Sequence, residues 1–457
     1  MKEKQVKPKR NHLPHYGRRT AVWTTYAASN GMEALLLGYM SFYLTDSVLM
    51  AAGTVGVIIA LSRVFDGISD VIAGFIIDRT NTRWGKARPY SIFSLVMWAA
   101  AVLLFSVPDM SNTGKIIYVF IMYNLADTVS RTMLFASESV HCKRAFNSDE
   151  QLDVVGVAGL VAGIVNMVVG VVMPLLINSV GQTKEGWTII ALCLAIPGGI
   201  MGTLKLFLLP ELDMKEVLEK KKEQHVSVKE SVVALLHNKY ILLFLAVGVA
   251  RYIITGMAMH TYYFTYIVGN LDLYSVVSMV GLLSMVVMPF IPALTRKLGI
   301  RKFATIFLFA GAVAYVSVYA APTNIILLAV SSAVTLLAGL PVSMLENLIA
   351  IQCMKYSEWR EGKKIEGVIA SMNGVSHKVG QAIGAMLVGF LLQMSGYDGA
   401  LAVQSGAASN MIIFLYVGLP AILMLISAIC MNGYRLEDKL DTIEAELAAR
   451  KETVSNG

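Results

Sequence analysis

Long apolar stretches alternate with short polar segments along almost the whole chain. An α-helix rises 1.5 Å per residue, so roughly 20 apolar residues are needed to cross the hydrocarbon core of a bilayer. Twelve stretches meet this requirement, and the pattern therefore predicts an all-α polytopic membrane protein with twelve transmembrane helices. The expected spans are 20–46, 51–77, 90–109, 115–137, 152–178, 186–209, 239–268, 273–294, 303–321, 324–354, 367–396 and 407–433.

The polar segments between the spans are basic on one side of the membrane only. The connection after every second span carries lysines and arginines, whereas the opposite connections hold only Lys115 and Lys184. Basic loops stay on the cytoplasmic side of a membrane. The sequence therefore predicts a multi-pass protein of the cell (plasma) membrane with both termini in the cytoplasm.

A charged, helix-prone loop at 210–238 divides the twelve spans into two groups of six. The second and eighth spans are each followed by a basic loop, and the fourth and tenth spans each carry polar residues, which indicates duplication. Two six-helix halves with a ligand site near the midplane between them are the arrangement of major facilitator transporters. The expected parts are an N-terminal tail 1–19, a half 20–209, the loop 210–238, a half 239–433 and a C-terminal tail 434–457.

Composition excludes several other classes of function. Hydrophobic residues make up 56% of the chain and charged residues only 15%, whereas soluble domains are about 25% charged. The net charge of +7 lies in short loops, so topology explains it and no nucleic-acid partner is expected. No phosphate-binding loop, catalytic triad or metal-ligand cluster is evident, and the four cysteines have no metal spacing. We therefore expect neither an enzyme nor an ATP-driven pump, no cofactor, and a monomer in the lipid bilayer.

The second span carries three charged residues on one helical face. Arg63, Asp66 and Asp70 follow one another at spacings of three and four. Charges inside a membrane are costly and usually functional. Two carboxylates one turn apart can offer oxygen ligands to Na⁺, or one of them can take up a proton because the pair repels. The alternative is a structural role, in which both aspartates pair with Arg63 and with basic residues at the cytoplasmic end.

The fourth span adds a further polar face. Asn124 and Asp127 lie one turn apart, and Arg131 follows Asp127 by four residues. One interpretation is a local ion pair between Asp127 and Arg131. The other places Asn124 and Asp127 in the same cavity as the aspartates of the second span, where a third carboxylate needs a cation or Arg131 to offset it.

Isolated polar residues on other spans complete the candidate site. Lys378 is the main isolated cation of the second half, and it either pairs with an acid across the cavity or extends to the cytoplasmic surface. Asn30 and Glu33 share a face of the first span and are candidates for binding sugar hydroxyls, and Tyr26 is a candidate for stacking on a sugar ring. Arg251, His260 and Glu346 are weaker candidates.

Three motifs resemble the glycoside–pentoside–hexuronide:cation symporter family. The first is RVFDGISD at 63–70 followed by DRTNTRWGKARPY at 78–90, the second is EWREGKKIEG at 358–367, and the third is Lys378 at its distance before 396–397. The resemblance covers nearly the whole chain. It implies that Asp66 and Asp70 are cation ligands, that Asp127 lies between cation and sugar with Asn124 nearby, and that Lys378 lies close to the cation site.

The sequence also departs from that family's sugar-binding pattern. Asn30 stands where melibiose permease has a sugar-binding aspartate, Val157 stands where it has the arginine partner, and Arg131 replaces a tryptophan. The cation end of the site is therefore kept while the sugar end is changed. The motif loops supply the expected cytoplasmic gate, which comprises Asp78, Arg79, Arg83, Trp84, Arg88, Glu358 and Glu366.

Taken together, the residues predict a secondary symporter that couples Na⁺ or H⁺ entry to uptake of a sugar or glycoside by alternating access. Asn30, Glu33, Asp127, Arg131 and Tyr26 are its expected substrate-binding residues, and Lys378 and Arg63 its expected coupling residues. One alternative is a cation-coupled transporter of an organic anion or amphiphile. Another is a sensor that does not transport, although a sensor has no need of the coupling carboxylates.

Overall fold

The computed structural model describes residues 16–211, 238–280, 286–361 and 366–455. These residues are almost entirely helical, and the only strand-like pairing among them is an isolated bridge between Thr82 and Gly85. The prediction of an all-α polytopic membrane protein is confirmed, and the structure is consistent with twelve spans. Seven of the described helices are long and apolar enough to cross a membrane: Asp153–Ser179, Lys184–Leu208, Lys239–Met257, Ile300–Ala320, Ile325–Glu346, Gly374–Met394 and Gly406–Leu447.

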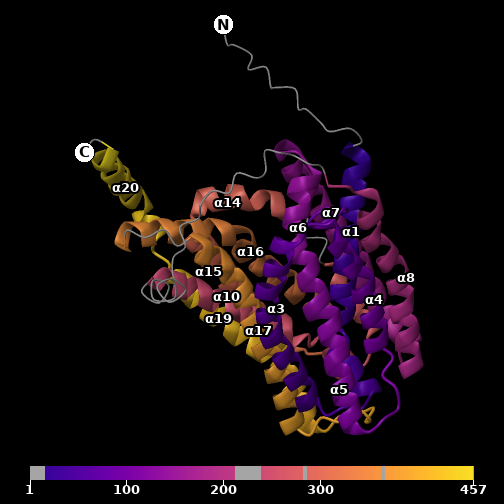
Figure 1. Cartoon of the computed structure of the whole chain (residues 1–457). Coiled ribbons are helices and arrows are strands. Elements are labelled where there is room, and N and C mark those ends of the chain that lie inside the picture. The colour runs from indigo at the N-terminus through magenta and orange to yellow at the C-terminus, as the bar shows by residue number, and fades with distance from the viewer. Residues whose placement is uncertain (1–15, 212–237, 281–285, 362–365, 456–457) are drawn as a thin grey trace. The chain divides into compact units, whose positions relative to one another are not determined.

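The chain forms two compact units. Unit 1 comprises Met1–Tyr43 and Val64–Lys221, and unit 2 comprises Leu44–Arg63 and Lys222–Gly457. The main helices of unit 1 are α1 (Tyr16–Gly38), α2 (Met40–Phe42), the C-terminal part of α3 (Ala52–Arg79), α4 (Phe93–Leu104), α5 (Asn112–Tyr123), the π-helical turn η3 (Asn124–Arg131), α6 (Thr132–Ala145), α7 (Ser148–Ser179) and α8 (Lys184–Leu208) (Figure 1).

Unit 2 begins at Leu44 and includes the N-terminal part of α3, which continues without a break into unit 1. Its other main helices are α10 (Lys239–Met257), α11 (His260–Tyr266), α12 (Asp272–Met279), α14 (Ile291–Leu298), α15 (Ile300–Ser317), α16 (Ile325–Glu361), α17 (Glu366–Met394), α18 (Gly406–Ile413), the π-helical turn η7 (Phe414–Gly418), α19 (Leu419–Asn432) and α20 (Leu440–Ser455). The division into halves at 20–209 and 239–433 stays a prediction.

Small residues let the helices of unit 1 approach closely. The Ser29 hydroxyl of α1 donates to the carbonyl oxygen of Gly198 on α8 at 2.6 Å and accepts from the Trp98 indole of α4 at 3.0 Å. A Cβ atom at Gly198 would lie 2.3 Å from the Trp98 ring. Three helices therefore meet at one point through a glycine and a serine, as is common where helices pack in membranes.

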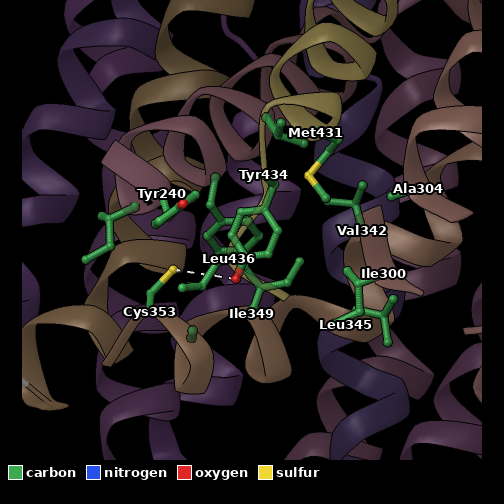
Figure 2. Close-up of a cluster of buried hydrophobic side chains, with 14 of the residues drawn as sticks. Tyr240, Ile300, Ala304, Val342, Leu345, Ile349, Cys353, Met431, Tyr434 and Leu436 are labelled. Atoms are coloured by element: carbon green, nitrogen blue, oxygen red, sulfur yellow. Dashed lines mark hydrogen bonds between the residues drawn. The ribbon is translucent and has the colours of Figure 1, made fainter. Parts of the chain in front are cut away.

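A tyrosine-rich core holds unit 2 together (Figure 2). Tyr240 of α10 packs edge-on against Tyr356 of α16 and against Tyr434, which follows α19. The buried Tyr434 hydroxyl donates to Gln352 at 2.9 Å, so its polar group is satisfied inside the core. The C-terminal helix α20 buries Ile443 in the same core, and it is therefore part of unit 2.

A single carboxylate shapes the basic loop of unit 1. Glu211, which follows α8, accepts hydrogen bonds from the backbone N–H groups of Lys86, Ala87 and Arg88 at 2.9, 2.6 and 2.6 Å. Gly85 precedes them with φ at +115°, and a Cβ atom there would lie 2.5 Å from the Glu211 carboxyl carbon. Only glycine satisfies both conditions, which explains the glycine of the WGKxRP motif in physical terms.

The loop between α14 and α15 of unit 2 has a similar arrangement. Glu437, which follows α19, accepts from the backbone N–H groups of Ile300 and Arg301 at 3.1 and 3.3 Å. Gly299 precedes them with φ at +77°, and a Cβ atom there would lie 3.0 Å from a Glu437 carboxylate oxygen. The basic loop of each unit is thus fixed by a carboxylate from the end of that same unit.

Replacing Glu211 with alanine removes the acceptor of three backbone donors, and the side chain is only 5% exposed. Hydrogen bonds to a charged group contribute about 1.5–3 kcal/mol each, so we expect Glu211→Ala to lower the free energy of unfolding by at least about 2 kcal/mol. Thermal unfolding of the purified protein in detergent measures the change. Glu185→Ala, on an exposed side chain at the opposite end of α8, is the control, and equal unfolding temperatures for the two variants would contradict the assignment.

Candidate functional site

The polar residues predicted on the fourth span lie in the π-helical turn η3. The Ser130 hydroxyl donates to the Leu125 carbonyl at 2.7 Å, and the Asn124 amide donates to the Phe120 carbonyl at 2.7 Å. Thr128 donates to the Asn124 side-chain oxygen at 3.1 Å. Side-chain hydrogen bonds therefore support this widened turn, a feature that occurs often at functional sites.

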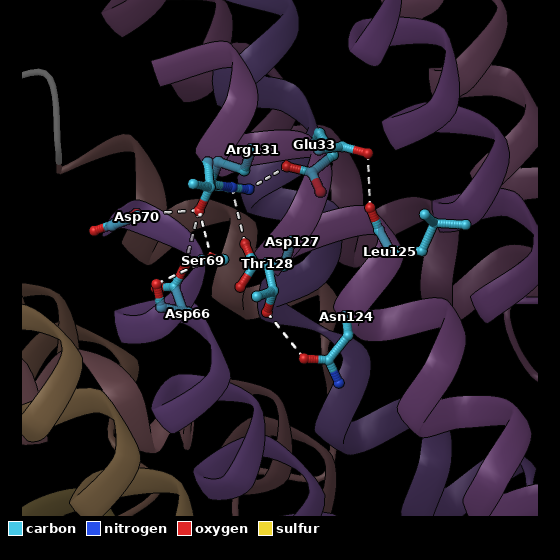
Figure 3. A network of polar contacts seen from close by, with 11 residues as sticks. Glu33, Asp66, Ser69, Asp70, Asn124, Leu125, Asp127, Thr128 and Arg131 are labelled. Atoms are coloured by element: carbon cyan, nitrogen blue, oxygen red, sulfur yellow. Dashed lines mark hydrogen bonds and ion pairs between the residues drawn. The ribbon is translucent and has the colours of Figure 1, made fainter. Parts of the chain in front are cut away.

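Arg131 connects two buried carboxylates (Figure 3). Its guanidinium pairs with Asp127 one turn away, with 2.8 Å between Nε and Oδ1, and with Glu33 of α1. The side chain of Glu33 is fully buried and that of Asp127 is 5% exposed. The local Asp127–Arg131 pair considered from the sequence is present, and its extension to Glu33 ties α1 to the fourth span.

Asp66 and Asp70 converge on one hydroxyl of the fourth span (Figure 3). Thr132, the first residue of α6, lies 3.1 Å from Oδ1 of each aspartate, and the Ser69 hydroxyl lies 3.2 Å from the Thr132 hydroxyl. A hydroxyl has one hydrogen, so Thr132 can donate to only one of the two carboxylates at a time. Two carboxylate and two hydroxyl oxygens thus meet in a donor set that suits a hard cation.

The structure places the predicted cation-site residues in two neighbouring groups. Asp66 and Asp70 share Thr132, whereas Asp127 is engaged by Arg131. Within the described residues, no three His, Cys, Asp or Glu side chains form a metal-binding group. The two groups adjoin along the chain because Arg131 and Thr132 are consecutive residues.

Of the other predicted substrate residues, Tyr26 is fully buried and Asn30 is half-buried on α1. The ammonium group of Lys205, in the last turn of α8, lies 3.7 Å from the centroid of the Tyr26 ring and 4.8 Å from that of Trp23. Lys205 is itself 1% exposed and is held by these cation–π contacts. Lys205 is not evident from the sequence, because a lysine near the end of an apolar run resembles one that reaches the membrane surface.

The expected coupling residues lie in unit 2. Lys378 is half-buried on α17, and Arg63 is half-buried on α3, one turn before Asp66. Next to Lys378, the His377 ring packs edge-on against Tyr252 of α10 with 4.7 Å between ring centroids. The pairing of either coupling residue with the aspartates of unit 1 stays a prediction.

The residues expected in a cytoplasmic gate have separate local roles. Arg88 donates to the carbonyl oxygens of Leu206 and Phe207 at 2.6 and 3.1 Å, so it caps the C-terminus of α8. The Arg79 guanidinium lies 3.9 Å from the centroid of the Phe75 ring. The remaining members are Arg83 and Trp84, which are exposed, Glu358, which is half-buried near the end of α16, and Asp78 and Glu366, whose side chains lie outside the described residues.

A half-buried carboxylate that is not evident from the sequence lies in unit 2. Asp46, after α2, accepts from the Tyr397 hydroxyl at 2.8 and 2.7 Å and from the Tyr266 hydroxyl. Thr45 donates to the same carboxylate, and its hydroxyl lies 2.9 Å from that of Tyr262. The signal in the sequence is weak because the tyrosines come from segments more than two hundred residues away.

Comparison with known proteins identifies the family to which the chain belongs. Residues 25–438 match the family described as MFS/sugar transport protein. An uncharacterized symporter, YnaJ of Bacillus subtilis, is 27% identical over 427 residues, which cover 90% of each chain. The isoprimeverose transporter of Lactiplantibacillus pentosus is 25% identical over 432 residues, which cover 92% of this chain and 88% of the relative.

The fold is also shared with solved transporters. A bacterial homologue of the human lysosomal transporter Spinster has a TM-score of 0.71 at 10% identity, over 94% of this chain and 98% of that chain. The matches confirm the resemblance to glycoside–pentoside–hexuronide:cation symporters, and they confirm a transporter rather than an enzyme.

Replacing Arg131 with glutamine leaves Glu33 and Asp127 buried without their shared cation. Removing one partner of a buried ion pair costs about 3–5 kcal/mol, so we expect Arg131→Gln to be strongly destabilising in thermal unfolding. The double variant Glu33→Gln/Arg131→Gln should recover part of that loss, because the carboxylate at Glu33 is then also gone. If the effects of the single variants Glu33→Gln and Arg131→Gln add up to that of the double variant, Arg131 and Glu33 do not interact.

Proposed function

Because the chain belongs to the MFS/sugar transport protein family, we propose that it is a secondary symporter that couples the entry of Na⁺ or H⁺ to uptake of a sugar or glycoside by alternating access. The observation that carries the proposal is the meeting of Asp66 and Asp70 at the Thr132 hydroxyl. The similarity to a symporter and to an isoprimeverose transporter supports both parts of it.

The coupling cation binds at Asp66 and Asp70. The two carboxylates lie close enough to share the Thr132 hydroxyl, so a monovalent cation bound between them would offset their mutual repulsion. Na⁺ takes the oxygens of the aspartates together with those of Ser69 and Thr132, whereas a proton is taken up by one of the carboxylates. Asp66 is buried and Asp70 is exposed, so the site is anchored on one side and open to an entering ion on the other.

Cation binding acts on the substrate site through the backbone of the fourth span. Thr132 contacts the cation carboxylates, and the preceding residue, Arg131, holds Glu33 and Asp127. A shift of Thr132 toward a bound cation therefore moves the guanidinium that orients the substrate-binding carboxylates. By linkage, substrate then raises the affinity for the cation by the same factor, typically worth about 1–3 kcal/mol.

The substrate binds through hydroxyl groups at the polar faces of α1 and the fourth span. Glu33 and Asp127 accept from sugar hydroxyls, Arg131 and Asn30 donate to them, and Tyr26 lies one turn from Asn30 along α1. Asn124 supports this face through its bond to Thr128. A carrier of an organic anion is the alternative, but two carboxylates already engage Arg131, and this occupied guanidinium favours a neutral sugar.

In the proposed topology, the chain lies in the plasma membrane and both of its termini lie in the cytoplasm. The loops of the WGKxRP and EWREGKK motifs then lie on the cytoplasmic side. Arg88 and Glu211 keep the first loop in one shape within unit 1, so we propose that it moves with that unit when the cytoplasmic side opens and closes.

The test is uptake of sugar into proteoliposomes under an imposed Na⁺ or H⁺ gradient. We expect Asp66→Asn and Asp70→Asn to retain sugar exchange without a gradient but to lose cation-driven accumulation. The neutral amide of asparagine cannot replace the carboxylate that binds the cation. Thr132→Val should weaken cation stimulation at least tenfold, whereas Thr132→Ser, which keeps the hydroxyl, should retain most of it.

Thr203→Val is the matched control, since Thr203 is a buried threonine on α8 of unit 1 whose hydroxyl donates to the Gly199 carbonyl of its own helix and not to an aspartate. Accumulation by Asp66→Asn and Asp70→Asn with unchanged ion dependence would place the cation site elsewhere.

A further inference from the structure

Unit 2 contains an ion pair that is held loosely inside the membrane-spanning segments. Arg251 lies on α10 and Glu346 on α16, and both helices are apolar enough to cross a membrane. The distance between Nη1 of Arg251 and Oε2 of Glu346 is 3.8 Å, which is too long for a hydrogen bond. Nη1 is a buried atom without a hydrogen-bond partner among the described residues.

Such an arrangement is costly unless another group completes it. Charged side chains within a membrane pair with each other or face water, and a buried donor without a partner costs about 1–3 kcal/mol. The two side chains are 30% and 15% exposed, so a small molecule can contact their outer atoms and would reach Nη1 when the two groups separate. A group that both accepts from Arg251 and donates to Glu346 would satisfy the two together.

The chemistry of the pair selects one class of ligand. A hydroxyl group accepts one hydrogen bond and donates another, so it can bridge a guanidinium and a carboxylate once they separate by about 1 Å to give two bonds of normal length. A carboxylate or phosphate on the ligand would satisfy Arg251 but would be repelled by Glu346. An ammonium group would be attracted to Glu346 but repelled by Arg251.

Aromatic side chains lie beside the pair. The Arg251 guanidinium lies 4.9 Å from the centroid of the Tyr252 ring, and Tyr252 packs against His377 of α17. A Cβ atom at Gly380 would lie 2.5 Å from Cβ of Tyr252, so this glycine allows α10 and α17 to bring the two rings together. A half-buried aromatic surface next to a hydroxyl-binding pair suits the apolar face of a sugar ring.

The Arg251–Glu346 pair in unit 2 differs from the Arg131 cluster in unit 1 in how closely its guanidinium is paired. In unit 1 the charges also come from the first and fourth spans of a predicted half, but the Arg131 guanidinium already pairs with two carboxylates. In unit 2 the single carboxylate of Glu346 lies beyond hydrogen-bond distance of Nη1. The Arg251 donor is therefore the more available of the two for a ligand.

We propose that Arg251 and Glu346 form a substrate subsite in unit 2 that binds a hydroxyl group of a neutral glycoside and disfavours uronides. The proposal rests on the proposed function and adds the substrate class to it. Arg251 donates to the sugar oxygen, Glu346 accepts the hydroxyl hydrogen, and Tyr252 contacts the ring.

The test compares a neutral disaccharide, isoprimeverose, with an anionic glycoside, methyl glucuronide, in proteoliposome uptake under Na⁺ and H⁺ gradients. We expect the wild type to prefer isoprimeverose. Arg251→Gln and Glu346→Gln should each raise its KM at least tenfold. Glu346→Gln should also narrow the preference against methyl glucuronide, because the repelling charge is gone, whereas Arg251→Gln should not.

Glu444→Gln is the matched control, because Glu444 pairs with Lys355 in the same unit at 2.5 Å but is 46% exposed and lies on the C-terminal helix. Unfolding temperatures equal to that of the wild type establish that the variants are folded. A wild-type preference for methyl glucuronide, or an unchanged KM for isoprimeverose in both variants, overturns the subsite and leaves the symporter proposal standing. A wild type that moves neither sugar under either gradient overturns the symporter proposal and the subsite with it.

Discussion

Compensation of buried charge is the constraint on which the arrangement of unit 1 depends. Glu33 and Asp127 are almost fully removed from solvent, and both pair with Arg131. The cost of an uncompensated carboxylate in such a place exceeds what most packing interactions can offset. The first and fourth spans therefore have to meet at Arg131, and this meeting fixes Thr132, the next residue, beside Asp66 and Asp70.

Polar groups at the ends of the helices also need partners, but there the carboxylate is the partner that is supplied. There the uncompensated groups are backbone N–H donors of a tight loop, and a carboxylate from the end of the unit supplies the acceptors. Gly85 and Gly299 leave room for Glu211 and Glu437 to approach. A loop fixed in this way keeps its shape within its own unit, which suits the proposed cytoplasmic gate.

The sequence predicted those features that depend on residues close together in the chain. Apolar runs located the helices, and spacings of three and four put Asp66 and Asp70 on one face and paired Asp127 with Arg131. It was uninformative where a partner lies far away in the chain, as for Glu33 and Arg131, because no periodicity relates residues on different helices.

Hydroxyl groups were overlooked for a different reason. Thr132 and Ser69 are unremarkable residues in apolar helices, and only their positions against two aspartates give them a role. Asp46 was missed for both reasons together: it ends an apolar run as an ordinary loop residue would, and the tyrosines that satisfy it come from distant segments. Oxygen-rich clusters of this kind become visible only after the helices are placed.

The charges of unit 1 also bear on the substrate. Around the fourth span, Glu33 and Asp127 pair with Arg131, and Asp66 and Asp70 lie against the Thr132 hydroxyl. For the proposed symporter, a neutral hydroxyl would bind to these carboxylates through hydrogen bonds, whereas an anionic group would be repelled by them. In the proposed mechanism, a cation lowers the cost of holding Asp66 near Asp70, and a sugar lowers the cost of burying Glu33 and Asp127. Because Arg131 and Thr132 are adjacent, we propose that a change at one of the two groups is transmitted to the other through this backbone, which would couple the two ligands.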